Sequence, residues 1–79
     1  MKEKDYWVET VLKIIKIELL KRKMTYHDLT EKLATIGVHE TEANIKNKMS
    51  RGKFSAIFFL QCLIALGVEH LVLTDDLLK

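Results

Sequence analysis

The sequence contains no proline and only three glycines, at positions 37, 52 and 67. Residues that break helices are therefore sparse, and each glycine is expected to mark a helix end. Apolar residues make up 48% of the 79 residues, which is enough for a hydrophobic core and is not typical of a disordered chain. We therefore expect a single all-α domain over residues 1–79, built as a compact bundle of four to five helices with room for a short C-terminal extended segment.

Capping residues and apolar periodicity predict where the helices begin. Thr25 stands before the second helix, and Asp28 three residues later can complete a capping box. Ser55 precedes a strongly apolar helix that Gly67 ends. The predicted helices span about 5–23, 25–37, 41–51 and 55–66, followed by a short strand or extended segment over 71–73 and a capped final turn over 74–78.

The segment 40–55 combines an apolar side with a polar, basic one. On a helical wheel Ile45 and Met49 share the side that would face the core. The remaining sides carry small, amide and basic residues, namely Ala43, Asn44, Lys46, Asn47, Ser50 and Arg51. Residues 44–53 include four basic and no acidic side chains. Because amides pair with adenine, guanidinium with guanine and lysine with phosphate, we interpret this segment as a DNA-reading helix. An ordinary solvated helix surface has the same composition.

Tyr26 and His27 occupy the predicted first turn of the second helix. The first amides of a helix have no partner within it and favour an anion. A phosphate contact at Tyr26 and His27 is therefore one interpretation, and a simple solvent-exposed cap is the other.

Residues 56–66 are apolar except for Gln61, which is more apolar surface than a domain this small can cover by itself. This mismatch predicts a homodimer. The interface would use Phe58 and Phe59 of this helix or Leu71 and Leu73 of the following tail, and the sequence leaves the choice between them open.

The remaining chemistry argues against an enzyme. His27, His39 and His70 are scattered along the chain without a second ligand at metal-binding spacing, and no glycine-rich phosphate loop is present. Cys62 is the sole cysteine and lies in an apolar run, where a buried thiol is expected. No stretch reaches the roughly 20 apolar residues that cross a bilayer. We expect a soluble cytoplasmic protein that has no cofactor, no metal and no membrane contact.

The order of elements resembles the lambda-repressor-like helix-turn-helix family, which includes phage repressors and xenobiotic-response-element-type regulators. The matching segments are Thr25–Thr30 at the first short helix, Ser50–Lys53 at the end of the recognition helix and Leu66–Val68 after the next helix. The core Asn47-Lys48-Met49-Ser50-Arg51-Gly52-Lys53-Phe54-Ser55 is also similar to that of small bacterial proteins of unknown function. Compared with the regulators, the turn between the two helices is several residues longer, and Thr30 replaces a small alanine.

The resemblance implies a homodimeric transcriptional regulator that reads double-stranded DNA with residues 41–51. Tyr26 would take the phosphate-clamping role of the family's glutamine. The implied DNA-binding residues are Tyr26, His27, Ala43, Asn44, Lys46, Asn47, Arg51 and Lys53. The alternative is a helical interaction or dimerisation module that keeps the fold without sequence-specific DNA binding; Glu40 and Glu42, which would repel phosphates, favour this alternative.

Overall fold

The computed structural model describes the backbone of residues 2–73 and the side chains of residues 6–73. Within that part of the chain the fold is entirely helical, without a strand, and comprises α1 (Lys2–Lys21), α2 (Tyr26–Thr35), α3 (Glu42–Arg51) and α4 (Ala56–Ala65). This confirms the expected compact, all-α fold. Residues 71–73 are irregular rather than a strand, and the predicted final turn at 74–78 lies outside the described residues.

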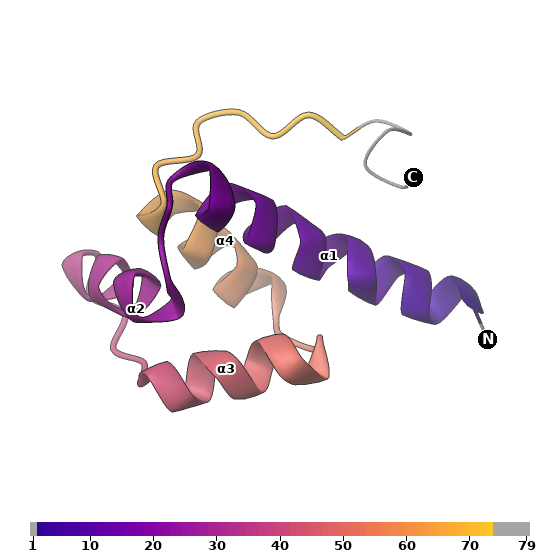
Figure 1. Ribbon diagram of the computed structural model, residues 1–79, viewed down its shortest axis with the longest axis horizontal. Coiled ribbons are helices and arrows are strands. Elements are labelled where there is room, and N and C mark those ends of the chain that lie inside the picture. Colours follow the sequence, from indigo (N-terminus) through magenta and orange to yellow (C-terminus); the bar gives the residue numbers. More distant parts are fainter. Residues whose placement is uncertain (1, 74–79) are drawn as a thin grey trace.

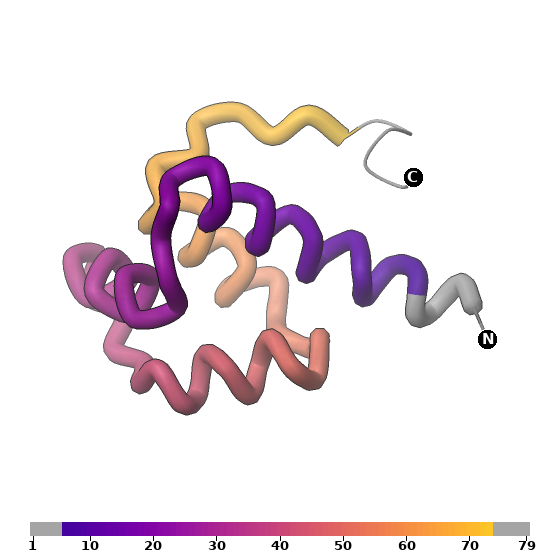
Figure 2. The backbone as a smooth tube through the Cα atoms, in the orientation of Figure 1, coloured from indigo at the N-terminus to yellow at the C-terminus, as the bar shows by residue number. Residues whose placement is uncertain are grey.

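The helices surround a shared core. Figure 1 shows α1 crossing the molecule in front of α4, with α2 and α3 on the side away from the C-terminal segment. α2 packs against both α3 and α4. Figure 2 traces residues 36–41 from α2 into α3, and residues 68–73 running back alongside α1. No described helix is both long enough and apolar enough to cross a membrane.

Every helix contributes apolar side chains to one buried cluster. Ile15 from α1, Leu29 and Leu33 from α2, and Ile45 from α3 are completely inaccessible to solvent. Full burial of side chains of this size stabilises a fold by about 1.5–3 kcal/mol each. Phe58, Cys62, Leu63 and Leu66 complete the cluster from α4 and its C-terminus.

The helix starts follow the predicted caps. The Thr25 hydroxyl accepts the Asp28 amide at 3.1 Å, and the Asp28 carboxylate accepts the Thr25 amide at 2.9 Å, so the capping box is complete. Thr41 and Ser55 cap α3 and α4 by accepting the amides of Asn44 and Phe58, each at 3.0 Å. Each of these hydrogen bonds satisfies an amide that has no partner within the helix.

The capping box makes part of the stability depend on pH. The hydrogen bond from the Thr25 amide lowers the pKa of Asp28 below its ordinary value of 3.8. A lowered pKa in the folded state means that the ionised carboxylate stabilises the fold above pH 3.8 and that this contribution disappears as pH falls below that value.

We expect Asp28→Asn to be less stable than wild type at pH 6, with the difference shrinking by pH 2.5. Urea unfolding at both pH values measures it. An equal difference at both would show that the charge contributes nothing.

Gly52 ends α3 in the left-handed conformation, with φ of 68°. It is buried against α1, where an added Cβ would approach Val8 Cγ1 more closely than real carbon atoms do and would lie 3.3 Å from Leu12 Cδ1. Only glycine combines this backbone conformation with this contact. The C-terminal end of α3 is therefore held against α1.

Candidate nucleic-acid interface

α3 has the orientation that the helical wheel predicts. Ile45 and Met49 are buried in the core, whereas the small, amide and basic positions are all exposed: Ala43, Asn44, Lys46, Asn47, Ser50 and Arg51. Thr41 and Gly52 fix the two ends of the helix and so set this register. Within the described residues the side chains of Asn44 and Asn47 have no hydrogen-bond partner, so their amides face solvent with donors and acceptors available.

The basic side chains of this region divide into two kinds. Lys46 pairs with Glu42 at 3.2 Å, one turn away on α3. Lys48 is half-buried, pairs with Glu40 at 3.7 Å and lies 4.5 Å from the centre of the Phe58 ring. In the described part of the chain, neither Arg51 nor Lys53 forms an ion pair, and both are exposed. The available positive charge therefore concentrates at the C-terminal end of α3.

The first turn of α2 lies beside the first turn of α3. His27 is exposed and stands 3.6 Å from a Glu31 oxygen and 3.5 Å from a Glu42 oxygen. Tyr26 is half-buried against the core. The capping box already uses the Asp28 amide and brings a carboxylate to this end of the helix. The three carboxylates make this end less favourable for a phosphate than the sequence alone indicates.

Of the three basic residues at the end of α1, Arg22 is the one that serves the fold, whereas Lys21 and Lys23 are exposed. The Arg22 Nε donates to the Leu66 carbonyl at 2.7 Å, and its Nη1 donates to the Glu18 carbonyl at 3.1 Å and to the Glu18 carboxylate. Glu18 is 8% exposed, and Lys21 approaches its other carboxylate oxygen at 3.6 Å. Arg22 thereby ties the C-terminal end of α1 to that of α4. The spacing of Glu18 and Arg22 was the one available sequence signal, since residues four apart meet on a helix.

The structure corrects one predicted interface residue. Phe58 is only 3% exposed because it lies in the core of its own chain, with its ring 5.4 Å from that of Phe54. Phe59 is half-buried, with its ring stacked on that of Phe54 at 6.4 Å. Phe58 is therefore not available to a second subunit. The large apolar residues of α4 that are exposed are instead Ile57, Leu60 and Ile64.

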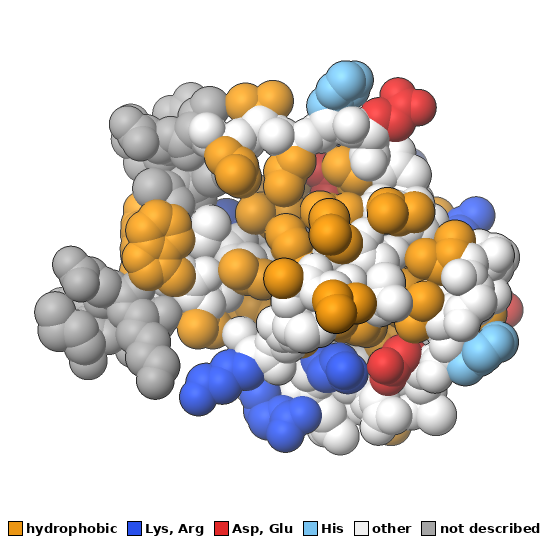
Figure 3. Space-filling model, turned by 180° about the vertical axis from the view of Figure 1, so that it is seen from behind, with side chains coloured by type: hydrophobic (Ala, Val, Ile, Leu, Met, Phe, Trp, Pro, Cys, Tyr) orange, Lys and Arg blue, Asp and Glu red, His pale blue; other side chains and the backbone are white. Residues whose placement is uncertain are grey.

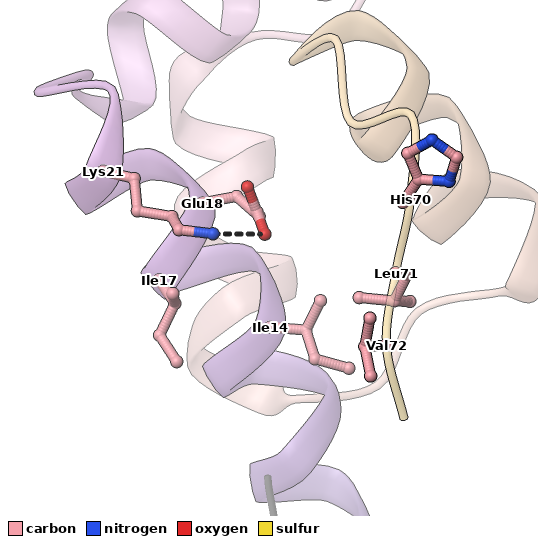
Figure 4. A pocket seen from close by; sticks show the side chains of 7 residues that line it. All are labelled: Ile14, Ile17, Glu18, Lys21, His70, Leu71 and Val72. Carbon is pink, nitrogen blue, oxygen red and sulfur yellow. Dashed lines mark ion pairs between the residues drawn. The ribbon is translucent and has the colours of Figure 1, made fainter. Parts of the chain in front are cut away.

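A shallow groove separates α1 from the C-terminal segment (Figure 4). It encloses about 210 Å³, and its lining comprises Ile14, Ile17, Glu18, Lys21, His70, Leu71 and Val72. Leu71 packs against the core from this side, whereas Leu73 is exposed. The carboxylate in the wall, that of Glu18, is already bound by Arg22 and by Lys21, which also lines the groove. The groove therefore has no unpartnered carboxylate with which to bind a ligand.

Cys62 is a core residue rather than a nucleophile. It is 1% exposed, and burial raises the pKa of its thiol from 9.0 to about 12. A thiol with this pKa is almost entirely protonated at neutral pH, and the thiolate is the reactive form. Among the described residues, no three His, Cys, Asp or Glu side chains form a group that could hold a metal ion.

The fold and the α3 surface together define a small all-helical domain with one polar, partly basic helix face. Residues 7–71 match the family described as "Domain of unknown function (DUF6471)", and the chain belongs to this family. No curated protein and no solved structure matches the chain. This result agrees with the predicted similarity to small proteins of unknown function. The assignment to the lambda-repressor-like family stays a prediction.

Proposed function

We propose that this chain is a DNA-binding helix-turn-helix module, acting as a transcriptional regulator, that reads duplex DNA with the outward face of α3. The single observation that carries the proposal is that Asn44, Asn47 and Arg51 are exposed together on one helix whose other side is locked into the core. Amide and guanidinium groups held on a rigid helix suit the donor and acceptor pattern of the major groove.

The basic side chains at the end of α3 also support the proposal that this helix binds DNA. Arg51 and Lys53, which have no ion pair among the described residues, would contact phosphates or a guanine at the end of α3. Lys46 would first have to leave Glu42, from which it is 3.2 Å away. Tyr26 and His27, at the start of α2, would contact a phosphate only if it approached despite repulsion by the Glu31 and Glu42 carboxylates.

The first experiment is a selection of bound sequences from a random duplex pool at two salt concentrations. We expect an enriched sequence and an affinity that falls steeply with salt, because phosphate contacts release counterions. Asn47→Ala is then expected to reduce the preference for the selected sequence by about 5- to 100-fold, the value of one good base contact. Lys53→Ala is expected to weaken binding to all duplexes alike and to lower the salt slope by about 1.

Lys21→Ala is the matched control, since it removes the same charge from the far end of α1, beside the C-terminal segment. Fluorescence anisotropy with the selected duplex and a scrambled one measures all three variants. Binding that is absent at micromolar protein, or equal losses for Lys21→Ala and Lys53→Ala, would contradict the proposal.

A second candidate is an interaction module without sequence-specific DNA binding. The observation that favours it is the negative charge near the start of α3. The Glu31 and Glu42 carboxylates both lie beside His27, and Glu42 also pairs with Lys46. Salt-insensitive self-association in the absence of any duplex binding would support this candidate over the first.

A further inference from the structure

α4 carries an exposed apolar stripe although its opposite side is fully used by the core. Ile57, Leu60 and Ile64 are 69%, 57% and 63% exposed, and they recur at intervals of three and four residues. Figure 3 shows hydrophobic side chains gathered in a broad patch on this side of the molecule. This spacing is that of a helix–helix seam, in which one apolar stripe packs against another.

The two ends of the stripe carry opposite charges. Lys53 precedes α4 and Glu69 follows it; both are exposed, and neither forms an ion pair within the described residues. In Figure 3 blue side chains, with a red one beside them, border the apolar patch on its lower edge, and a red and a pale-blue side chain lie at the upper edge. A partner that covers the stripe should therefore present a negative group at one end and a positive group at the other.

We infer that the stripe is covered by a second copy of this chain, with the two α4 helices antiparallel across a two-fold axis. In a two-fold symmetric contact between antiparallel helices, all pairs of residues that face each other have the same midpoint in residue number, which is where the axis passes. Positions 57 and 64 are centred between 60 and 61, and positions 53 and 69 are centred on 61. An axis between positions 60 and 61 thus sets Ile57 against Ile64 of the second copy, and brings Lys53, which precedes α4, to the end where Glu69 of the second copy follows its α4.

The same charges disfavour the parallel orientation. A parallel pair would place Lys53 against the second copy's Lys53 and Glu69 against its Glu69, and like charges repel. The antiparallel pair instead gains both ion pairs and buries three exposed apolar side chains from each copy. The inference goes beyond DNA binding and does not depend on it, since only α4 and its flanking residues are involved.

Sedimentation equilibrium of the full chain tests the inference, with Leu60→Glu as the main variant. Leu60 lies outside the core, so the variant should keep the wild-type helical circular dichroism. We expect its dimer dissociation constant to rise at least about 100-fold, because two carboxylates would enter the apolar centre of the interface. Leu20→Glu is the matched control, since Leu20 is 77% exposed on α1 and should leave the dimer unchanged. A monomeric wild type at millimolar concentration, or equal effects of the two variants, would overturn the inference.

Cross-linking tests the antiparallel register. Under mild oxidation two Leu60→Cys chains should be joined by a disulfide between their cysteines at position 60. A mixture of Ile57→Cys and Ile64→Cys chains should form a disulfide between one chain of each kind. Wild type is the control, because its Cys62 is buried. Preferential pairing of Ile57→Cys with itself would indicate a parallel dimer and overturn the proposed arrangement.

A charge exchange tests the ends of the stripe by the same self-association measurement. Lys53→Glu and Glu69→Lys should each weaken the dimer about tenfold, since each change affects two symmetric ion pairs. The combined variant should regain most of the wild-type affinity, and failure to regain it would contradict the pairing of these ends. Because the readout is dimer formation without DNA, this outcome is independent of the role proposed for Lys53 at a duplex.

Discussion

Arg22→Met is expected to lower the free energy of unfolding by about 3 kcal/mol. The substitution leaves the buried Glu18 carboxylate without its guanidinium partner, and it removes the hydrogen-bond donor to the Leu66 carbonyl. Breaking one side of a buried ion pair costs about 3–5 kcal/mol, and the partial exposure of Arg22 places this pair at the lower end. A chain of this length has only about 4–12 kcal/mol of stability in total, so the loss should be plain in urea unfolding.

Two further variants separate the charge from the side-chain volume. Lys21→Met removes a cation that faces the same carboxylate from solvent, and we expect a loss below about 1 kcal/mol. The double variant Glu18→Met with Arg22→Met should recover part of the lost stability, because no unpaired charge remains buried. If Arg22→Met costs no more than Lys21→Met, the network does not stabilise the fold.

Gly52→Ala is expected to cost about 2–5 kcal/mol. Holding a residue with a Cβ at φ of 68° costs about 1–2 kcal/mol. The added methyl group must also displace Val8 and Leu12 of α1, and overpacking of this kind costs about 1–3 kcal/mol. Chemical denaturation followed by circular dichroism measures the combined effect.

Gly37→Ala is the matched control for Gly52→Ala. Gly37 also has a positive φ, 83°, but no atom lies within 4 Å of the position that its Cβ would take. This variant therefore reports the backbone cost alone, about 1–2 kcal/mol. Val8→Ala in the Gly52→Ala background should relieve part of the additional cost. Equal destabilisation by the two glycine variants would mean that α1 does not press on Gly52.

Features that depend on neighbouring residues in the chain could be predicted from the sequence. The caps at Thr25 and Ser55, the helix end at Gly52 and the inward side of α3 at Ile45 and Met49 all follow from local spacing. Each depends on hydrogen bonds or side-chain directions within about one helical turn. The exposed face of α3 was predictable for the same reason, since fixing the buried side of a helix also fixes the opposite one.

Features that depend on tertiary contacts could not be predicted in this way. Arg22 and Lys48 count as surface charges in a sequence, but the first reaches a carbonyl 44 residues away and the second lies over a phenylalanine ring. Phe58 and Ile57 are adjacent and both apolar, yet only Phe58 points into the core. In a helix that is apolar on nearly every side, periodicity does not identify the buried face.

The hydrogen bond from Arg22 to the Leu66 carbonyl also determines how much of the chain must fold together. It joins the first helix to the end of the last, so α1 and α4 cannot separate without exposing Glu18 and leaving that carbonyl without its arginine donor. Opening of either helix should therefore be a global rather than a local event. A fragment beginning after α1 would lack this connection, and we expect it not to fold by itself.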